Sequence, residues 1–209
     1  MDIARFRKKP IMGILRGVDL KILTPLIETI IASGLETIEI TMNTDNAVHL
    51  IKTAKNIASG KLTIGAGTVL TVKQLNNALR AGATFIVMPT CTQKLVKSCL
   101  KQNIPVFPGA LTPQEIYTAW GMGATMVKVF PARFFGPEYF KEIKGPFDSI
   151  ELLACGGVTP ENMRAYFTNG ASAITFGASV FQKEWLAQCR FSHIAELIKR
   201  YIGNLPKEV

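Results

Sequence analysis

The chain has 209 residues, of which 48% are hydrophobic and 19% are charged, and its formal net charge at pH 7 is +9. This composition is typical of a globular protein with a full apolar core, and the length favours one domain over residues 1–209. No apolar stretch approaches the roughly 18 residues of a membrane span, and the N-terminal residues lack the apolar segment of a signal peptide. We therefore expect a cytoplasmic protein with no membrane partner.

The basic residues are spread along the chain, with no basic run beyond residues 5–9 and no nucleic-acid-binding motif. We expect the partner to be a phosphorylated or carboxylated metabolite and not nucleic acid. The 4 cysteines form no CxxC pair, and the 2 histidines, His49 and His193, both fall in predicted helices. This pattern argues against a metal site with histidine ligands and against a histidine-based nucleophilic triad.

Strand-like and helix-like segments alternate after a short predicted N-terminal helix. The predicted strands span residues 11–17, 37–42, 62–67, 83–89, 104–109, 125–132, 150–157 and 172–179. Helices between them are predicted to end at Gly34, Gly60, Gly82, Gly123 and Gly170, and others to begin at Thr44, Thr112 and Thr159. Eight such β/α units predict an α/β fold of the closed (β/α)8 TIM barrel type, in preference to an open doubly wound sheet.

The strand predicted over residues 125–132 contains a single lysine in an apolar alternating pattern. Alternation places Lys128 on the same face as Met126 and Phe130. If that face is enclosed, burial disfavours the ammonium form, so we expect the pKa of Lys128 to fall and a neutral amine to attack a carbonyl. The alternative interpretation is a lysine on an edge strand whose ammonium reaches solvent.

In such a barrel the chemistry gathers at the C-terminal strand ends, where the ionisable residues are Arg16, Glu39 and Lys128. A carboxylate beside a lysine amine can move protons during imine formation and hydrolysis, so Glu39 is the candidate general acid and base. The alternative is a carboxylate that only neutralises Lys128. The other candidate substrate-binding residues at these ends are Thr41, Asn43, Thr68, Pro89, Phe130, Cys155, Gly156, Gly157, Gly177 and Ser179.

Small residues at the last two strand ends indicate a phosphate site. Gly156-Gly157 and the segment 177–179 follow adjacent predicted strands, and the corresponding loops of such barrels frequently bind phosphate through backbone N–H groups. Cys155 precedes the two glycines without a histidine or another base near it in the sequence. We therefore interpret Cys155 as a small pocket-lining residue and not as a nucleophile.

Together these motifs resemble, over nearly the whole chain, those of the class I 2-keto-3-deoxy-6-phosphogluconate / 4-hydroxy-2-oxoglutarate aldolases. The matching segments are ILRG around Arg16, EIT around Glu39, GAGTVL at 65–70, MP at 88–89, PGALTPQE at 108–115, KVFPA at 128–132 and GGV at 156–158. The resemblance implies a barrel, commonly a homotrimer, that cleaves a 2-keto-4-hydroxy acid to pyruvate and an aldehyde without a metal or a cofactor. It also implies a place in the Entner-Doudoroff type of carbohydrate metabolism.

By this resemblance Lys128 forms the Schiff base and Glu39 is the general acid and base. Thr68 helps to hold the pyruvyl carboxylate, and Phe130 packs beside the imine. The residues implied to surround the substrate phosphate are Gly156, Gly157, Gly177 and Ser179.

Two positions depart from the phosphogluconate enzymes. Asn43 stands where those enzymes usually carry an arginine that contacts the substrate carboxylate, and Cys155 stands where they usually carry a threonine. Loss of a bidentate cation predicts a different carboxylate affinity or substrate choice. Asn43, together with FFGPEYFKEIKG at 134–145, resembles the 6-phosphogalactonate branch of the family.

Two other functions are alternatives for a barrel of this kind. A metal-dependent sugar-phosphate epimerase needs His and Asp ligands at strand ends, where this sequence has none. A barrel that binds a sugar acid without turnover is the second alternative, with Asn43 marking lost catalysis. The presence of both Lys128 and Glu39 argues against it.

Overall fold

The computed structural model describes residues 1–206, so the last three residues of the predicted domain lie outside the described part. Its strands pair only in parallel. They are β1 (Ile11–Leu15), β2 (Thr37–Thr41), β3 (Thr63–Gly67), β4 (Ile86–Val87), β5 (Val106–Phe107), β6 (Gly109–Ala110), β7 (Val127–Val129), β8 (Leu152–Cys155) and β9 (Ala173–Phe176).

The sheet closes on itself through the segment that contains β5 and β6. These two strands stand at opposite ends of the order β5-β4-β3-β2-β1-β9-β8-β7-β6, yet only Pro108 separates them in the chain. Proline lacks the N–H group that a sheet ladder needs, which accounts for the division of this strand. The TIM barrel prediction is therefore confirmed, and the predicted fifth strand is present as two short pieces.

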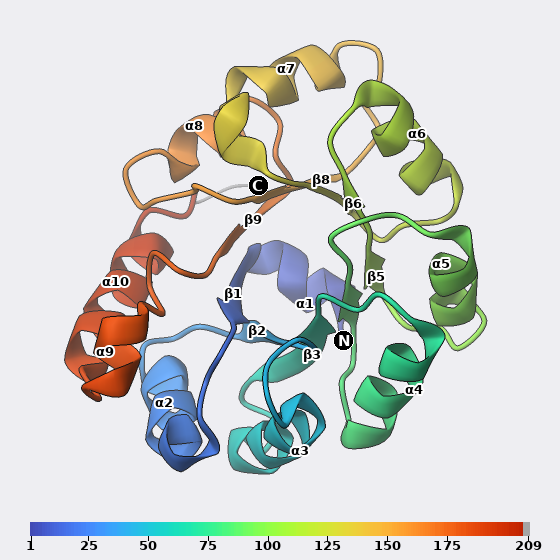
Figure 1. The fold of residues 1–209 in the computed structure, drawn as a ribbon. Helices are drawn as coiled ribbons and strands as arrows, with labels where there is room; N and C mark the ends of the chain where they lie inside the picture. Colours follow the sequence, from blue (N-terminus) through green and yellow to red (C-terminus); the bar gives the residue numbers. More distant parts are fainter. Residues whose placement is uncertain (207–209) are drawn as a thin grey trace.

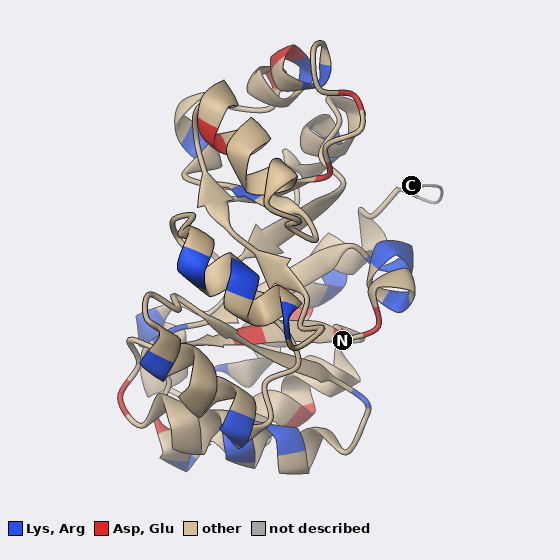
Figure 2. Cartoon of the chain, turned by 90° about the vertical axis from the view of Figure 1, so that its right-hand side faces the viewer, with Lys and Arg blue, Asp and Glu red and all other residues tan. Residues whose placement is uncertain are grey.

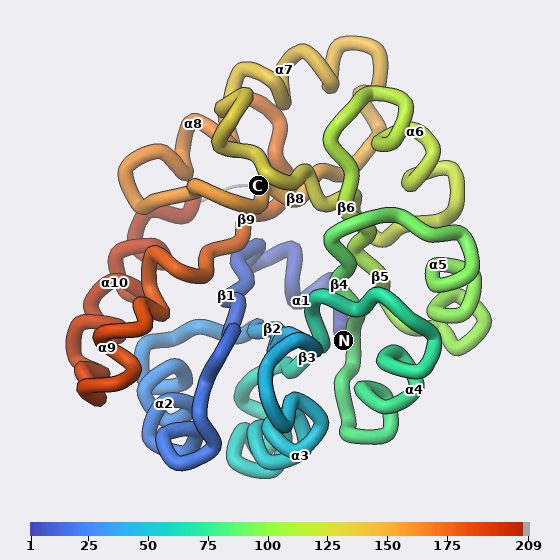
Figure 3. The backbone as a smooth tube through the Cα atoms, in the orientation of Figure 1, coloured from blue at the N-terminus to red at the C-terminus, as the bar shows by residue number. Residues whose placement is uncertain are grey.

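Helices follow the strands and surround the barrel (Figure 1). They are α2 (Leu20–Ala32), α3 (Ala47–Ala58), α4 (Val72–Ala81), α5 (Gln93–Leu100), α6 (Pro113–Gly121), α7 (Glu138–Lys144), α8 (Met163–Thr168), α9 (Lys183–Ala187) and α10 (Phe191–Gly203), with a 3-10 turn η1 (Ala132–Phe134) after β7. The chain runs once around the barrel, so α10 lies beside α2 (Figure 3). On the side drawn in Figure 2, the basic segments lie on several separate helices.

The predicted helix ends are confirmed at the C-termini, where all five predicted glycines have positive φ angles. At the N-termini, Thr112 caps α6 as predicted, in a capping box with Glu115. The predictions for Thr44 and Thr159 are wrong. Asn46 and Asn162 occupy the N-cap positions of α3 and α8, because each threonine is held in a turn that precedes its helix.

The N-terminal end of the barrel is closed by apolar side chains. Helix α1 (Ile3–Lys8) lies across the far end of the barrel in Figure 1 and inserts Phe6 into it. The Phe6 ring packs edge-on against Phe107 at 6.1 Å between centroids, and Phe107 packs against Phe85 at 5.8 Å. A ligand therefore reaches the barrel interior from the C-terminal end.

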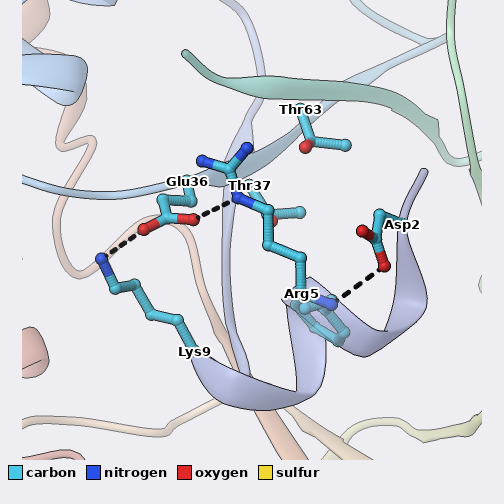
Figure 4. Close-up of a pocket in the computed structure, with 7 residues that line it drawn as sticks. Asp2, Arg5, Lys9, Glu36, Thr37 and Thr63 are labelled. Atoms are coloured by element: carbon cyan, nitrogen blue, oxygen red, sulfur yellow. Dashed lines mark hydrogen bonds and ion pairs between the residues drawn. The ribbon is translucent and has the colours of Figure 1, made fainter. Parts of the chain in front are cut away.

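Ion pairs hold α1 in this position (Figure 4). Glu36, directly before β2, accepts hydrogen bonds from Arg5 Nε at 2.8 Å and from Lys9 Nζ at 2.6 Å, while Asp2 caps the first turn of α1. The hollow between these side chains has a volume of about 10 Å³, which is room for a single water molecule. This cluster therefore holds α1 against the barrel, and the hollow is too small to be a ligand site.

No helix of residues 1–206 is long and apolar enough to cross a membrane.

Candidate active site

Lys128 and Glu39 lie inside the barrel. Lys128 is the middle residue of β7, two residues after Met126, which belongs to the interior cluster. Glu39 is the middle residue of β2, with its carboxylate directed toward Gly67 of β3. Only 6% of Lys128 and 1% of Glu39 is exposed. The edge-strand interpretation of Lys128 is wrong, because its ammonium is enclosed by the barrel.

Two glycines of β3 make room for these interior groups. A Cβ atom at Gly67 would overlap the Glu39 carboxylate, and a Cβ atom at Gly65 would overlap the Phe85 ring below it. The GAGTVL segment therefore has glycine at both inward positions because the opposite side chains fill that space. Sequence reasoning took this segment only as a family motif and missed its steric purpose.

Burial dominates the electrostatics of Glu39. It raises the pKa of the carboxyl group, and although the positive charges of Lys128 and Arg16 lower it, the net direction is upward. The Oε2 atom is fully buried and has no hydrogen-bond partner among the described residues. A buried carboxylate oxygen without a donor is costly, so this atom suits a donor that a ligand brings.

The pKa of Lys128 differs from the sequence-based expectation. Burial lowers it, but the adjacent Cys155 thiol and the Glu39 carboxylate raise it by more, and the net direction is upward. The expected fall is therefore wrong, because charged and polar neighbours outweigh desolvation. Lys128 is held as an ammonium and must transfer a proton before it can act as a nucleophile.

Arg16, Thr68 and Phe130 lie at the mouth above this pair. Arg16 Nη2 donates a hydrogen bond to Thr68 Oγ1 at 3.2 Å, and the Arg16 charge acts on both Glu39 and Lys128. Thr68 directly follows β3 with a φ angle of 53°, a backbone conformation that is uncommon outside glycine. Lys128 Nζ lies 5.2 Å from the centroid of the Phe130 ring, which is 39% exposed.

Thr41 is part of the framework of the site. Its Oγ1 atom lies 2.9 Å from Thr44 Oγ1, which accepts a hydrogen bond from the Gly17 N–H at 3.0 Å. Thr44 thus ties the ends of β1 and β2 together, a role that sequence reasoning missed because Thr44 has the pattern of a helix cap. Asn43 is exposed on the turn between these two threonines.

A cleft of about 300 Å³ opens beside Phe130. Pro89 lines it, together with the segment 109–111 after β5 and side chains of α6 such as Glu115. The structure thus brings Pro89 and Phe130 to one side of the mouth.

Residues 1–206 contain no cluster of three or more His, Cys, Asp or Glu side chains able to hold a metal ion.

The predicted phosphate segments follow β8 and β9. Gly156 and Gly157 have φ angles of 95° and 81°, which favour glycine. The N–H groups of Gly157, Ala178 and Ser179 have no acceptor among the described residues, and free backbone donors of this kind suit an anion. Gly177 packs against Ile14 of β1.

Tyr201 of α10 ties these two segments together. Its hydroxyl donates to the Val158 carbonyl at 2.8 Å and lies 3.2 Å from Ser179 Oγ. Burial raises the pKa of Tyr201 to about 12, so the hydroxyl remains a donor at neutral pH. Sequence reasoning missed this residue, because a tyrosine in an apolar helix pattern has the signature of a core residue.

Comparison with known proteins places this arrangement in a family. The family model described as "KDPG and KHG aldolase" matches residues 3–197. The chain belongs to this family. The 2-dehydro-3-deoxy-6-phosphogalactonate aldolase of Escherichia coli (strain K12) is 30% identical over 195 residues, covering 93% of this chain and 95% of the relative. The 2-dehydro-3-deoxy-phosphogluconate aldolase of Pseudoalteromonas atlantica is 34% identical over 200 residues, covering 95% and 93%.

Solved structures of KDPG and KHG aldolases agree with the fold. The KDPG aldolase from Legionella pneumophila, with pyruvate captured as a covalent carbinolamine intermediate, has a TM-score of 0.86 at 29% identity and covers 94% of this chain and 95% of its own. Relatives of this chain are thus named for both phosphogluconate and phosphogalactonate substrates, at similar identity. These comparisons establish membership of the aldolase family.

Proposed function

We propose that this protein is a Schiff-base (class I) aldolase that cleaves a 2-keto-3-deoxy-6-phospho sugar acid or 4-hydroxy-2-oxoglutarate to pyruvate and an aldehyde. The aldehyde is glyceraldehyde 3-phosphate or glyoxylate, respectively. The observation that carries the proposal is a buried lysine whose charge interacts with the buried Glu39 carboxylate, of which the Oε2 atom has no partner among residues 1–206. Membership of a family of named aldolases supports it.

The proposed reaction begins with loss of a proton from the Lys128 ammonium, with Glu39, the carboxylate whose charge acts on Lys128, as the proposed acceptor. The amine then adds to the C2 carbonyl of the substrate to form a carbinolamine, and loss of water forms the imine. The protonated imine accepts the electron pair of the C3–C4 bond while a base removes the proton of the C4 hydroxyl. The aldehyde leaves, the enamine is protonated at C3, and hydrolysis releases pyruvate and Lys128.

The remaining candidate residues have proposed binding roles around this reaction. Thr68, held by Arg16, helps to bind the pyruvyl carboxylate, and Phe130 packs against the imine. Cys155 lines the pocket beside Lys128. The residues proposed to surround the substrate phosphate are Gly156, Gly157, Gly177 and Ser179.

The decisive test is borohydride reduction in the presence of pyruvate, followed by mass spectrometry of the intact protein and of its peptides. The wild type should gain one pyruvate-derived adduct on Lys128, and Lys128→Met should gain none. Lys141→Met, which removes an exposed lysine of α7, is the matched control and should retain the adduct. A folded wild type without an adduct would contradict the proposal and favour the barrel that binds a sugar acid without turnover.

Asn43→Arg tests whether the missing guanidinium sets the substrate choice. A side chain at this exposed position does not disturb the core, and arginine can form two parallel hydrogen bonds with a carboxylate. We expect kcat/KM for 2-keto-3-deoxy-6-phosphogluconate to rise about tenfold relative to the wild-type enzyme. Steady-state kinetics of the variant and the wild type measure this gain. No gain would show that Asn43 does not limit the reaction.

The assembly and location of the protein stay predictions. Exposed aromatic side chains such as Tyr117 (58% exposed) are available for a subunit contact in the predicted homotrimer. A cytoplasmic location and a role in Entner-Doudoroff carbohydrate metabolism are expected from the family resemblance.

A further inference from the structure

We infer that Arg133 is a specificity-determining residue that recognises the phosphate group at the far end of the substrate. The inference rests on the proposed aldolase function. Arg133 is not among the strand-end residues assigned above. Its place beside the site follows from the packing of η1, after β7, against the Gly156-Gly157 turn, after β8.

Arg133 lies on the rim of the barrel mouth. It is the middle residue of η1, which Phe130 and Pro131 separate from β7, the strand that carries Lys128. A Cβ atom at Gly157 would overlap Arg133 Cβ and lie 3.4 Å from both Cα and Cγ of Arg133. The arginine is therefore packed on the glycine turn after β8, at the place where the Gly157 N–H has no acceptor among the described residues.

The charge of Arg133 is available to a ligand. Arg133 is exposed, and the ion pairs of the described residues involve Arg5, Arg7, Lys9 and Arg200 as the cations. The guanidinium carbon lies 5.5 Å from the centroid of the Phe134 ring. Contact with an aromatic face occupies the plane of a guanidinium and leaves its N–H groups free to donate.

The reaction geometry points to this side of the mouth. Lys128 attacks C2 of the substrate, whereas the phosphate is attached to C6 at the opposite end of the carbon chain, so the phosphate must lie away from Lys128 along the rim. The lining of the cleft beside Phe130 includes the Glu115 carboxylate and contains no lysine or arginine among the described residues, so it offers no cation to a phosphate dianion. The glycine turn after β8 offers free backbone donors together with a cation.

A guanidinium beside the Gly156-Gly157 turn would make the turn selective for phosphate over other polar groups. Backbone N–H groups alone can bind a hydroxyl, a carboxylate or a phosphate, whereas a guanidinium forms paired, charge-assisted hydrogen bonds with phosphate oxygens. Removal of such bonds costs roughly 1.5–3 kcal/mol, which corresponds to about 10- to 100-fold in kcat/KM. We therefore expect Arg133 to set the preference for phosphorylated over unphosphorylated substrates.

The test compares Arg133→Ala and Arg133→Lys with Arg164→Ala, which removes an exposed arginine of α8 that has no ion pair among residues 1–206. Arg133→Ala should lower the ratio of kcat/KM for the 6-phospho sugar acid to that for 4-hydroxy-2-oxoglutarate by about 10- to 100-fold. It should also weaken inhibition by inorganic phosphate. Arg133→Lys should recover part of both effects, and Arg164→Ala should match the wild type.

An Arg133→Ala enzyme with the wild-type ratio and wild-type inhibition by phosphate would overturn the inference. Borohydride trapping of pyruvate, run in parallel, separates this result from a failure of the proposed function. A wild type that traps pyruvate while Arg133→Ala keeps its selectivity refutes the role of Arg133 alone. A wild type that traps no pyruvate refutes the aldolase proposal and, with it, this inference.

Discussion

Replacement of Lys128 by methionine is expected to lower kcat/KM for aldol cleavage on the order of 10⁵-fold, because no other group in the site can form the imine. Methionine has a similar length and no charge, so the barrel interior stays filled. Steady-state cleavage assays measure the loss, with Lys141→Met as the control. Substantial residual activity in Lys128→Met would contradict a Schiff-base mechanism.

The same substitution is expected to change stability in a pH-dependent way. Loss of the ammonium removes a positive charge that lowers the pKa of Glu39, so this pKa rises further above its ordinary value. A carboxyl group with a raised pKa favours the folded state at low pH, and this advantage is lost as the pH rises from the unfolded pKa to the folded one. Relative to wild type, the free energy of unfolding of Lys128→Met should therefore fall as the pH rises from about 4, the ordinary pKa of a glutamate, to about 7.

Urea unfolding at both pH values checks this expectation. The double variant Lys128→Met/Glu39→Gln should lose the pH-dependent difference, since it contains no ionisable group at either position. If the two variants show the same pH dependence, Glu39 is not the group responsible.

Replacement of Glu39 by glutamine is expected to lower kcat about 10²- to 10⁴-fold, the usual cost of removing a positioned general acid and base. Glutamine keeps the shape of the side chain beside Gly67 but cannot accept the proton of the C4 hydroxyl. The imine lysine is still present, so pyruvate trapping should persist at a reduced rate. Single-turnover and steady-state measurements separate these two effects.

The pH profile gives a second readout of the same residue. The general base must be ionised, so wild-type activity falls as the pH drops through the pKa of Glu39. Burial raises that pKa, and the acid limb should therefore lie at higher pH than for an ordinary glutamate. The limb should disappear in Glu39→Gln. Glu36→Gln, at the closed end of the barrel beside α1, is the matched control and should retain the limb.

The sequence by itself determined the order of the strands, the closure of the barrel and the inward faces of Lys128 and Glu39. These follow from local rules, because a period of two in a strand and a glycine after a helix act over a few residues. Local rules gave the wrong helix N-cap where hydrogen bonds in a preceding turn held the predicted residue outside the helix. Thr44 and Thr159 have the pattern of helix caps, yet turn contacts hold both before their helices begin.

Only the tertiary structure decided the electrostatic state of the site. The pKa of Lys128 depends on Cys155 and Glu39, which reach it from β8 and β2, and burial alone predicted the wrong direction. The unpartnered Oε2 of Glu39, the space left by Gly67 and the contact of Arg133 with Gly157 likewise involve residues far apart in the chain. Charge and steric interactions act through space, so they are defined only when the barrel brings separate strands together.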